Sequence, residues 1–235
     1  MDTDSFEARR DEILERLARA AARSGRDVAA VKVVAVTKTV DAVRIRAAAA
    51  AGFEAFGENR VQERQSKAEA LAGVPAEWHL VGPLQSNKAR RAVELFDVIE
   101  TVDSVDLARR LDRIAGEIRP GDRLPVLLQV NVDDDPAKAG FEPHDLDAGL
   151  EEILGLPALA VHGLMTVGRL VESSAAARPT FAALRDLSER LRARDARLGS
   201  ALSMGMSDDY EVAVEEGATT VRIGRAIFGA RPAAR

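Results

Sequence analysis

Short apolar runs alternate with longer amphipathic segments along the whole chain. The runs lack a regular alternation of polar and apolar residues, which is typical of parallel strands that are covered on both faces. We predict eight strands, at residues 31–36, 53–58, 77–82, 98–102, 125–132, 159–167, 201–205 and 220–229. The segments between them carry apolar residues at helical spacing, for example Leu107, Leu111, Ile114 and Ile118.

The pattern predicts a closed barrel of strands and helices. Asp103 or Ser104 is placed to cap the helix that begins near residue 105. A further helix precedes the first strand and ends near Gly25, with an apolar face formed by Phe6, Ile13, Leu17 and Ala21. Strands that alternate with helices form right-handed βαβ units. Eight units favour a (β/α)8 TIM barrel with an additional N-terminal helix, in a single domain spanning residues 1–235.

Composition narrows the function classes. The chain has no cysteine, which excludes disulfides, thiolate nucleophiles and Cys-type zinc sites. Its formal net charge is −5 and it has no basic run, so nucleic acid is not the expected partner. The longest uncharged stretch, 153–168, is shorter than a membrane span, and the acidic first residues are unlike a signal peptide. We therefore expect a cytoplasmic protein with no membrane partner.

Lysine is scarce, because only five of the 33 basic residues are lysine. In a barrel of this kind, functional residues lie at the C-terminal ends of the strands and in the loops that follow. Lys38 takes such a position at the end of the first apolar run. Desolvation there would favour the neutral amine that attacks a carbonyl group. The alternative is a lysine that simply extends into solvent at the end of a strand.

The last two apolar runs carry residues suited to phosphate. Ser203 and Ser207 flank a glycine-containing turn, and Gly224 lies between Arg222 and Arg225. Exposed backbone amides bind phosphate, and many barrels place a phosphate in the loops after the seventh and eighth strands. A Schiff-base lysine opposite such a site would fit pyridoxal 5′-phosphate (PLP). The alternative for the serines is helix capping.

Other kinds of chemistry have less support. The three histidines, His79, His144 and His162, lack the spacing of a metal site, so we predict no metal and place them in the core or at the barrel mouth. Glu58 and Asp103 end the second and fourth runs and suggest a glycosidase pair, although aromatic residues make up only 4% of the chain, too few for sugar-stacking platforms. The common nucleotide-binding loops are absent.

Several segments match a known family. They are VAVTKT around Lys38, FGENRVQE (56–63), WHLVGPLQSNK (78–88), VNVDDDPAKAGF (130–141), GLMTVG (163–168) and LSMGMSDDYEVAVEEGATTVRIGRAIFGAR (202–231). Together they closely resemble the pyridoxal phosphate homeostasis proteins, over nearly the whole chain and in the same order. The resemblance implies a barrel like the N-terminal domain of bacterial alanine racemase.

The resemblance also implies where PLP is held. Lys38 would carry it as a Schiff base, with Asn59 near the ring and Arg222 facing the pyridine nitrogen. An arginine there disfavours protonation of that nitrogen, because two positive charges would be brought together. The cofactor would then be a poor electron sink.

The remaining site residues follow from the same resemblance. Ser203 or Ser207, with Gly224 and Arg225, would hold the phosphate. The ring pocket would be lined by His79 and Met204. The family pattern has a small hydroxyl residue where this chain has Arg225, which leaves the role of that residue open.

We expect a protein that carries and buffers PLP in vitamin B6 homeostasis, without a catalytic residue of its own. Apo forms of PLP-dependent enzymes are the expected recipients. The alternative is a PLP-dependent amino-acid racemase, which needs a second base from a further domain, whereas this chain ends after the eighth strand and its only tyrosine is Tyr210. Without such a domain we expect a monomer. Lys138 is a second candidate for transient attachment of PLP.

Overall fold

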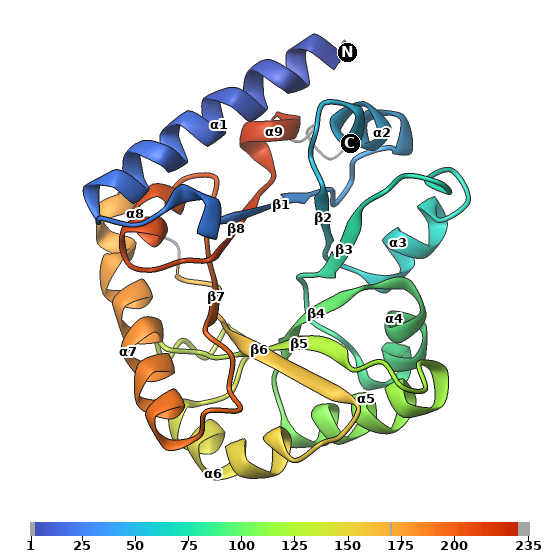
Figure 1. Cartoon of the computed structure of the whole chain (residues 1–235), viewed down its shortest axis with the longest axis vertical. Helices are drawn as coiled ribbons and strands as arrows, with labels where there is room; N and C mark the ends of the chain where they lie inside the picture. Colours follow the sequence, from blue (N-terminus) through green and yellow to red (C-terminus); the bar gives the residue numbers. More distant parts are fainter. Residues whose placement is uncertain (1–2, 170, 230–235) are drawn as a thin grey trace.

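Eight parallel strands close into a barrel in the order in which they occur in the sequence (Figure 1). The computed structural model describes residues 3–169 and 171–229. Pairing of the last strand with the first closes the barrel, with Lys32 opposite Thr220. The strands are β1 (Lys32–Val36), β2 (Ala55–Glu58), β3 (Glu77–Leu80), β4 (Val98–Val102), β5 (Leu124–Gln129), β6 (Leu159–Met165), β7 (Ala201–Met206) and β8 (Thr220–Ile223). The predicted (β/α)8 barrel is confirmed.

Helices surround the barrel on the outside (Figure 1). They are α2 (Ala42–Ala50), α3 (Val61–Lys67), α4 (Ala89–Leu95), α5 (Val105–Ile118), α6 (Pro143–Leu154), α7 (Arg178–Arg194), α8 (Tyr210–Glu215) and α9 (Arg225–Phe228), with short 3-10 turns η1 (Val28–Ala30), η2 (Ser86–Lys88) and η3 (Ser174–Ala177). The additional N-terminal helix, α1 (Thr3–Arg23), is also confirmed and packs against α8, α2 and α9. Of the two cap candidates for α5, Ser104 is the N-cap and accepts a hydrogen bond from the Leu107 amide.

The predicted eighth strand is too long. It ends at Ile223, and the second half of the run forms α9 instead. The amides of Ile227 and Phe228 donate to the Gly224 carbonyl, and the Phe228 ring packs edge-on against Phe6 of α1, with 5.7 Å between the ring centroids. A helical turn therefore buries these apolar side chains against α1 while their amides stay hydrogen-bonded.

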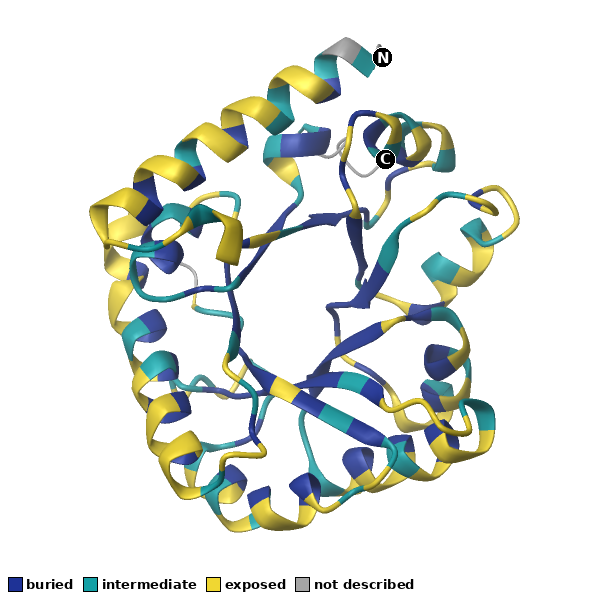
Figure 2. Ribbon diagram, viewed as in Figure 1, coloured by how far each residue is buried: buried dark blue, intermediate teal, exposed yellow. Residues whose placement is uncertain are grey.

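The buried residues form an outer layer, shared by strands and helices, and an inner layer inside the ring of strands (Figure 2). Most buried apolar side chains lie in one large cluster that includes the inner faces of the helices. A much smaller apolar cluster contains Val34, Val36 and Ala55 of β1 and β2, with Val81 directly after β3. Several buried polar side chains also come from the strands, among them His79, Glu100, Ser203 and Arg222. Such polar groups remain buried only when they are paired, so their partners organise the barrel interior, here called the bore.

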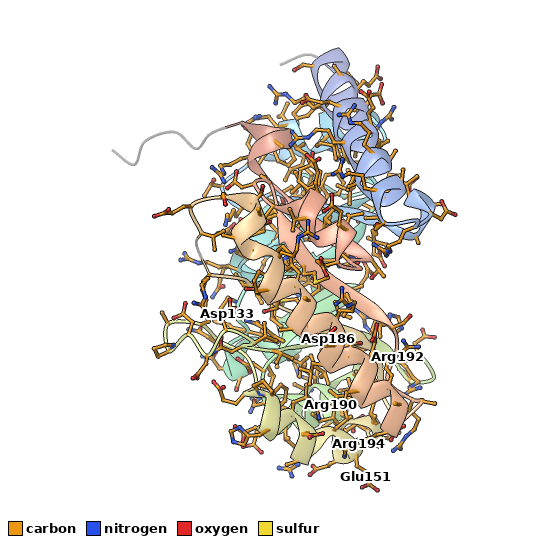
Figure 3. All side chains as sticks on the ribbon, turned by 90° about the vertical axis from the view of Figure 1, so that its left-hand side faces the viewer. Asp133, Glu151, Asp186, Arg190, Arg192 and Arg194 are labelled. Atoms are coloured by element: carbon orange, nitrogen blue, oxygen red, sulfur yellow. The ribbon has the colours of Figure 1, made fainter. Side chains whose placement is uncertain are left out.

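The surplus of arginine is largely a feature of the helical surface. Arg190 and Arg194 of α7, labelled in Figure 3, both pair with Asp147 of α6. Similar pairs link α7 to the end of α8, where Arg178 contacts Glu215 and Glu216. In the described part of the chain, no helix has the length and apolar character needed to cross a membrane.

Candidate functional site

Lys38 lies in a tightly fastened turn between β1 and α2. The Thr37 amide donates to the Gly57 carbonyl at 2.8 Å, and the Val40 amide donates to the Thr37 carbonyl at 3.0 Å. Thr39 has φ +64°, in the left-handed region that a β-branched residue rarely adopts. Surrounding contacts must therefore hold this conformation, and they fix where the half-buried Lys38 side chain begins.

A pocket of about 170 Å³ opens beside this turn, at the C-terminal ends of β1 and β8. Lys38 and Thr39 line one part of it, and Gly224 and Arg225 line another. Other lining residues come from the start of α2 and from α9, including Asp41, Arg44 and Phe228. The structure thus brings together three residues that the sequence singled out, from opposite ends of the chain.

Ser207 connects the two phosphate-binding candidates. Its hydroxyl oxygen accepts from the amides of Gly224 at 3.3 Å and Ala226 at 3.5 Å. Two amide donors thus converge at one place, as a phosphate oxygen would require. Gly205, with φ +90°, lets α8 approach this loop, because a Cβ there would come within 2.5 Å of the Ala213 side chain.

The Arg225 side chain has a partner of its own, separate from these amides. Its guanidinium pairs with Asp208, and both side chains are exposed. Asp208 thus holds the Arg225 side chain at the rim. A small hydroxyl residue in place of Arg225 would carry no charge for Asp208 to balance.

Arg222 lies in the bore, almost completely buried. Its guanidinium donates to the Thr166 carbonyl at 2.7 Å and to the Ser203 hydroxyl at 2.6 Å. Ser203 in turn donates to Glu100 at 2.5 Å, and Nδ1 of His79 lies 2.6 Å from the other oxygen of Glu100. Ser203 therefore binds Arg222 rather than joining Ser207 and Gly224. These four residues, Arg222, Ser203, Glu100 and His79, are called the ionic row below.

The charges in the ionic row support one another. Burial alone would lower the pKa of His79, but the carboxylates of Glu100 and Glu77, which accept from its ring, outweigh burial and raise that pKa to about 9. Burial would likewise raise the pKa of Glu100, yet His79 and Arg222 lower it. At neutral pH the carboxylate is ionised and the imidazole is protonated.

Asn59 and Met204 are not among the residues that line the Lys38 pocket. Asn59 borders a separate hollow with Arg60 and Lys88, and its backbone lies so close to Gly82 that a Cβ there would come within 2.3 Å of the Asn59 carbonyl oxygen. Met204 is fully buried in the large apolar cluster that it shares with the helices. Neither side chain lines the Lys38 pocket.

Two residues beside Lys38 were not recognised from the sequence as parts of its surroundings. Lys67, at the end of α3, donates to Glu58 at 2.7 Å and to the Thr37 carbonyl at 3.0 Å. Glu58 also accepts from the Thr37 hydroxyl at 2.8 Å. Burial raises the pKa of Glu58 to about 7, despite Lys67. The signal in the sequence was an acid at the end of an apolar run, which the glycosidase hypothesis had assigned to a pair with Asp103.

The glycosidase pair and the metal site find no support in the described contacts. The hydrogen bonds of Glu58 within residues 3–169 and 171–229 join it to Lys67 and Thr37 and not to Asp103. His144 is exposed and lies beside its neighbour Asp145. Within the same described ranges, no group of three His, Asp or Glu residues could hold a metal ion.

A larger cavity of about 700 Å³ opens at the opposite face of the barrel. It is lined by residues at or near the strand beginnings, including Lys32, Glu77 and His162, and by His79 deeper inside. In barrels of this type, chemistry takes place at the C-terminal face, so size alone does not make this cavity the site. His79 lies here, away from the pocket beside Lys38.

Comparison with known proteins now identifies the family. A model of the alanine racemase N-terminal domain matches residues 9–232. A pyridoxal phosphate homeostasis protein of Pseudomonas aeruginosa is 45% identical over 222 residues, 93% of each chain. The chain belongs to this family. The Escherichia coli K12 homeostasis protein is 39% identical over 228 residues, 94% of each chain, so the predicted resemblance is confirmed.

Solved structures extend the homeostasis family comparison. PipY of Synechococcus elongatus, solved with PLP bound, is 45% identical, with a TM-score of 0.80 over 92% of this chain and 100% of that chain. Alanine racemase from Clostridium difficile is 14% identical, with a TM-score of 0.68 over 94% of this chain and 60% of the racemase chain. At that identity the racemase comparison shows only a shared fold.

Proposed function

We propose that this chain binds PLP reversibly and serves as an intracellular carrier and buffer of the cofactor. The observation that carries the proposal is the single pocket that Lys38 shares with Gly224 and Arg225, in a family whose member PipY is solved with PLP bound. The Lys38 amine would add to the aldehyde of PLP, and loss of water would then give a Schiff base.

The loop residues fit the phosphate of PLP. The amides of Gly224 and Ala226 converge on the Ser207 hydroxyl, and phosphate oxygens would take up the same donors. We assign the phosphate to Ser207, Gly224 and the backbone of Arg225, because the Arg225 side chain is engaged with Asp208.

Arg222 suits a cofactor that is held but not used for carbanion chemistry. Its guanidinium stays charged even though burial lowers its pKa. Facing the pyridine nitrogen, it would oppose protonation of the ring and weaken the ring as an electron sink. This supports storage over turnover.

The racemase alternative has Tyr210 as its only tyrosine for a second base. Tyr210 is 1% exposed and lies in α8, where Arg16 of α1 stacks over its ring. A phenol in that position does not face the Lys38 pocket. We therefore propose no catalytic role for this chain.

The finer features of the carrier are proposals as well. We place it in the cytoplasm as one monomeric PLP-binding domain over residues 1–235, with apo forms of PLP-dependent enzymes as recipients. Lys138, whose amine donates to the Gly168 carbonyl at 3.2 Å, remains a second attachment point during loading. Asn59 stays a candidate near the ring.

Absorption spectroscopy and borohydride trapping test the proposal. The protein loaded with PLP should be yellow, and reduction should fix the label on Lys38 by peptide mass mapping. Lys38→Ala should abolish the visible band, while Lys88→Ala, another lysine in a loop after a strand, should leave it unchanged. A Lys38→Ala protein that still binds PLP with the same spectrum would refute the Schiff-base assignment.

A further inference from the structure

The ionic row continues toward the opposite face of the barrel. Nε2 of His79 lies 3.2 Å from a carboxylate oxygen of Glu77, and Glu77 pairs with Lys32. The side chains of Glu77 and Lys32 are 37% and 48% exposed, whereas Glu100 is completely buried. Charges of alternating sign therefore run from solvent at the N-terminal face to Arg222 in the bore.

Glu100 is the only anion that the described contacts place between two buried cations of the bore. One of its oxygens meets His79 and the other receives the Ser203 hydroxyl, with the Arg222 guanidinium 3.9 Å away. A buried guanidinium without a counter-charge is strongly unfavourable. Glu100 is the larger of two negative charges that offset Arg222, the other being Asp209. Ser203 links Glu100 to Arg222 through two short hydrogen bonds.

We infer that Glu100 is a positioning residue for PLP: through Ser203 it fixes the place of Arg222, and as an anion it limits the positive charge presented to the pyridine ring. This inference rests on the proposed function, because it concerns the ring that Arg222 would face. His79 has the supporting part, since it holds the second oxygen of Glu100 and keeps the carboxylate turned toward Ser203.

The substitution Glu100→Gln removes the anion and nearly preserves the shape of the side chain. Thr101→Val is the matched control, because Thr101 is the next residue of β4, is 1% exposed and donates one hydrogen bond to the Gly82 carbonyl. It loses a buried hydrogen bond without touching the ionic row. Glu100→Asp keeps the charge and should restore part of each property lost in Glu100→Gln.

The first experiment needs no cofactor. In the PLP-free protein, nitrogen-detected NMR of guanidinium groups should show slow solvent exchange for the Arg222 side chain, because both its hydrogen-bond acceptors are buried. Glu100→Gln should accelerate that exchange at least tenfold, and Thr101→Val should not. Unchanged exchange in Glu100→Gln would overturn the inference whether or not the chain binds PLP.

The second experiment follows the PLP-loaded protein. Loss of one nearby negative charge should lower the pH midpoint of the visible band by about one unit, since a cationic linkage becomes harder to maintain. Thr101→Val should keep the wild-type midpoint, and Glu100→Asp should fall between. If the wild type binds no PLP at Lys38, the proposed function fails, while the exchange experiment still decides the role of Glu100. An unshifted midpoint in Glu100→Gln would show that Glu100 has no influence on the ring.

Discussion

Glu58 and Glu100 are both completely buried strand residues, yet the barrel shifts their pKa values in opposite directions. Burial dominates at Glu58 and raises its pKa to about 7. At Glu100 the same desolvation is outweighed by His79 and Arg222, and the pKa is lowered. Equal burial therefore does not give equal charge.

The difference lies in the partners. Glu58 is hydrogen-bonded to a cation, Lys67, through one oxygen, and its second oxygen has no hydrogen-bond partner among the described residues. Glu100 has both oxygens engaged and two cations nearby. A buried carboxylate stays ionised only when hydrogen bonds and charges replace its hydration. The barrel thus holds a neutralisable acid beside the Lys38 turn and a permanent anion in the bore.

The largest effect should come from removing the permanent anion. Glu100→Gln removes the anion that His79 and Arg222 share and leaves them only Glu77 and Asp209 as counter-charges. We expect it to lower the free energy of unfolding by about 3–5 kcal/mol at pH 7. Glu58→Gln should cost less than about 1 kcal/mol at pH 6, because glutamine resembles the protonated acid. Urea denaturation of both variants measures the contrast, and equal losses would contradict it.

The pH dependence of stability should separate the two regions next. The folded-state pKa of His79, about 9, exceeds its ordinary value of 6.5, so its contribution is complete below pH 6.5 and is lost as the pH rises to 9. That loss is roughly 3 kcal/mol. The pKa of Glu58 is raised from 4.5 to about 7, so its contribution to stability is complete below pH 4.5 and is lost as the pH rises to 7. His79→Gln should flatten only the upper window in denaturation curves, and Glu58→Gln only the lower one.

Lys67 should matter more for binding than for stability. Lys67→Met removes the donor to the Thr37 carbonyl and the cation beside Glu58, so the Lys38 turn is held less firmly. We expect PLP affinity to fall about tenfold, the worth of one charged hydrogen bond. Spectroscopic PLP titration measures it, with Lys88→Met as the control. If both variants bind alike, the Glu58–Lys67 pair does not support the turn.

The smallest effect is expected at the exposed rim. Arg225→Ser breaks the pair with Asp208, in which both side chains are exposed, and should change stability by less than about 0.5 kcal/mol. PLP affinity should stay within about threefold, because the converging amides belong to Gly224 and Ala226 and the Arg225 guanidinium pairs with Asp208. A large loss of PLP affinity in the same titration would instead show that the Arg225 guanidinium belongs to the phosphate site.

Much of the fold was predictable from local patterns. Continuous apolar runs mark strands buried on both faces, and all eight occur in the barrel. The eighth run was misread beyond Ile223, because Ile227 and Phe228 are as apolar in a helical turn as in a strand. Only their packing against α1 distinguishes the two.

The site was predictable where a residue type is rare or constrained by chemistry. Lys38, Gly224 and Arg225 do border one pocket. Ser203 and Ser207, by contrast, could not be separated by sequence, because their different partners, Glu100 and the amides of α9, come from distant segments. For the same reason the sequence could not show that His79 contacts Glu100, and its place near the ring stays a prediction.

The sequence by itself determined the barrel, the absence of thiol chemistry and the lysine at the end of the first strand, because these depend on composition and on periods of a few residues. The tertiary structure alone decided which buried acid keeps its charge. Glu58 and Glu100 are chemically identical, and only partners brought from distant strands and helices set the free energy of ionising each one.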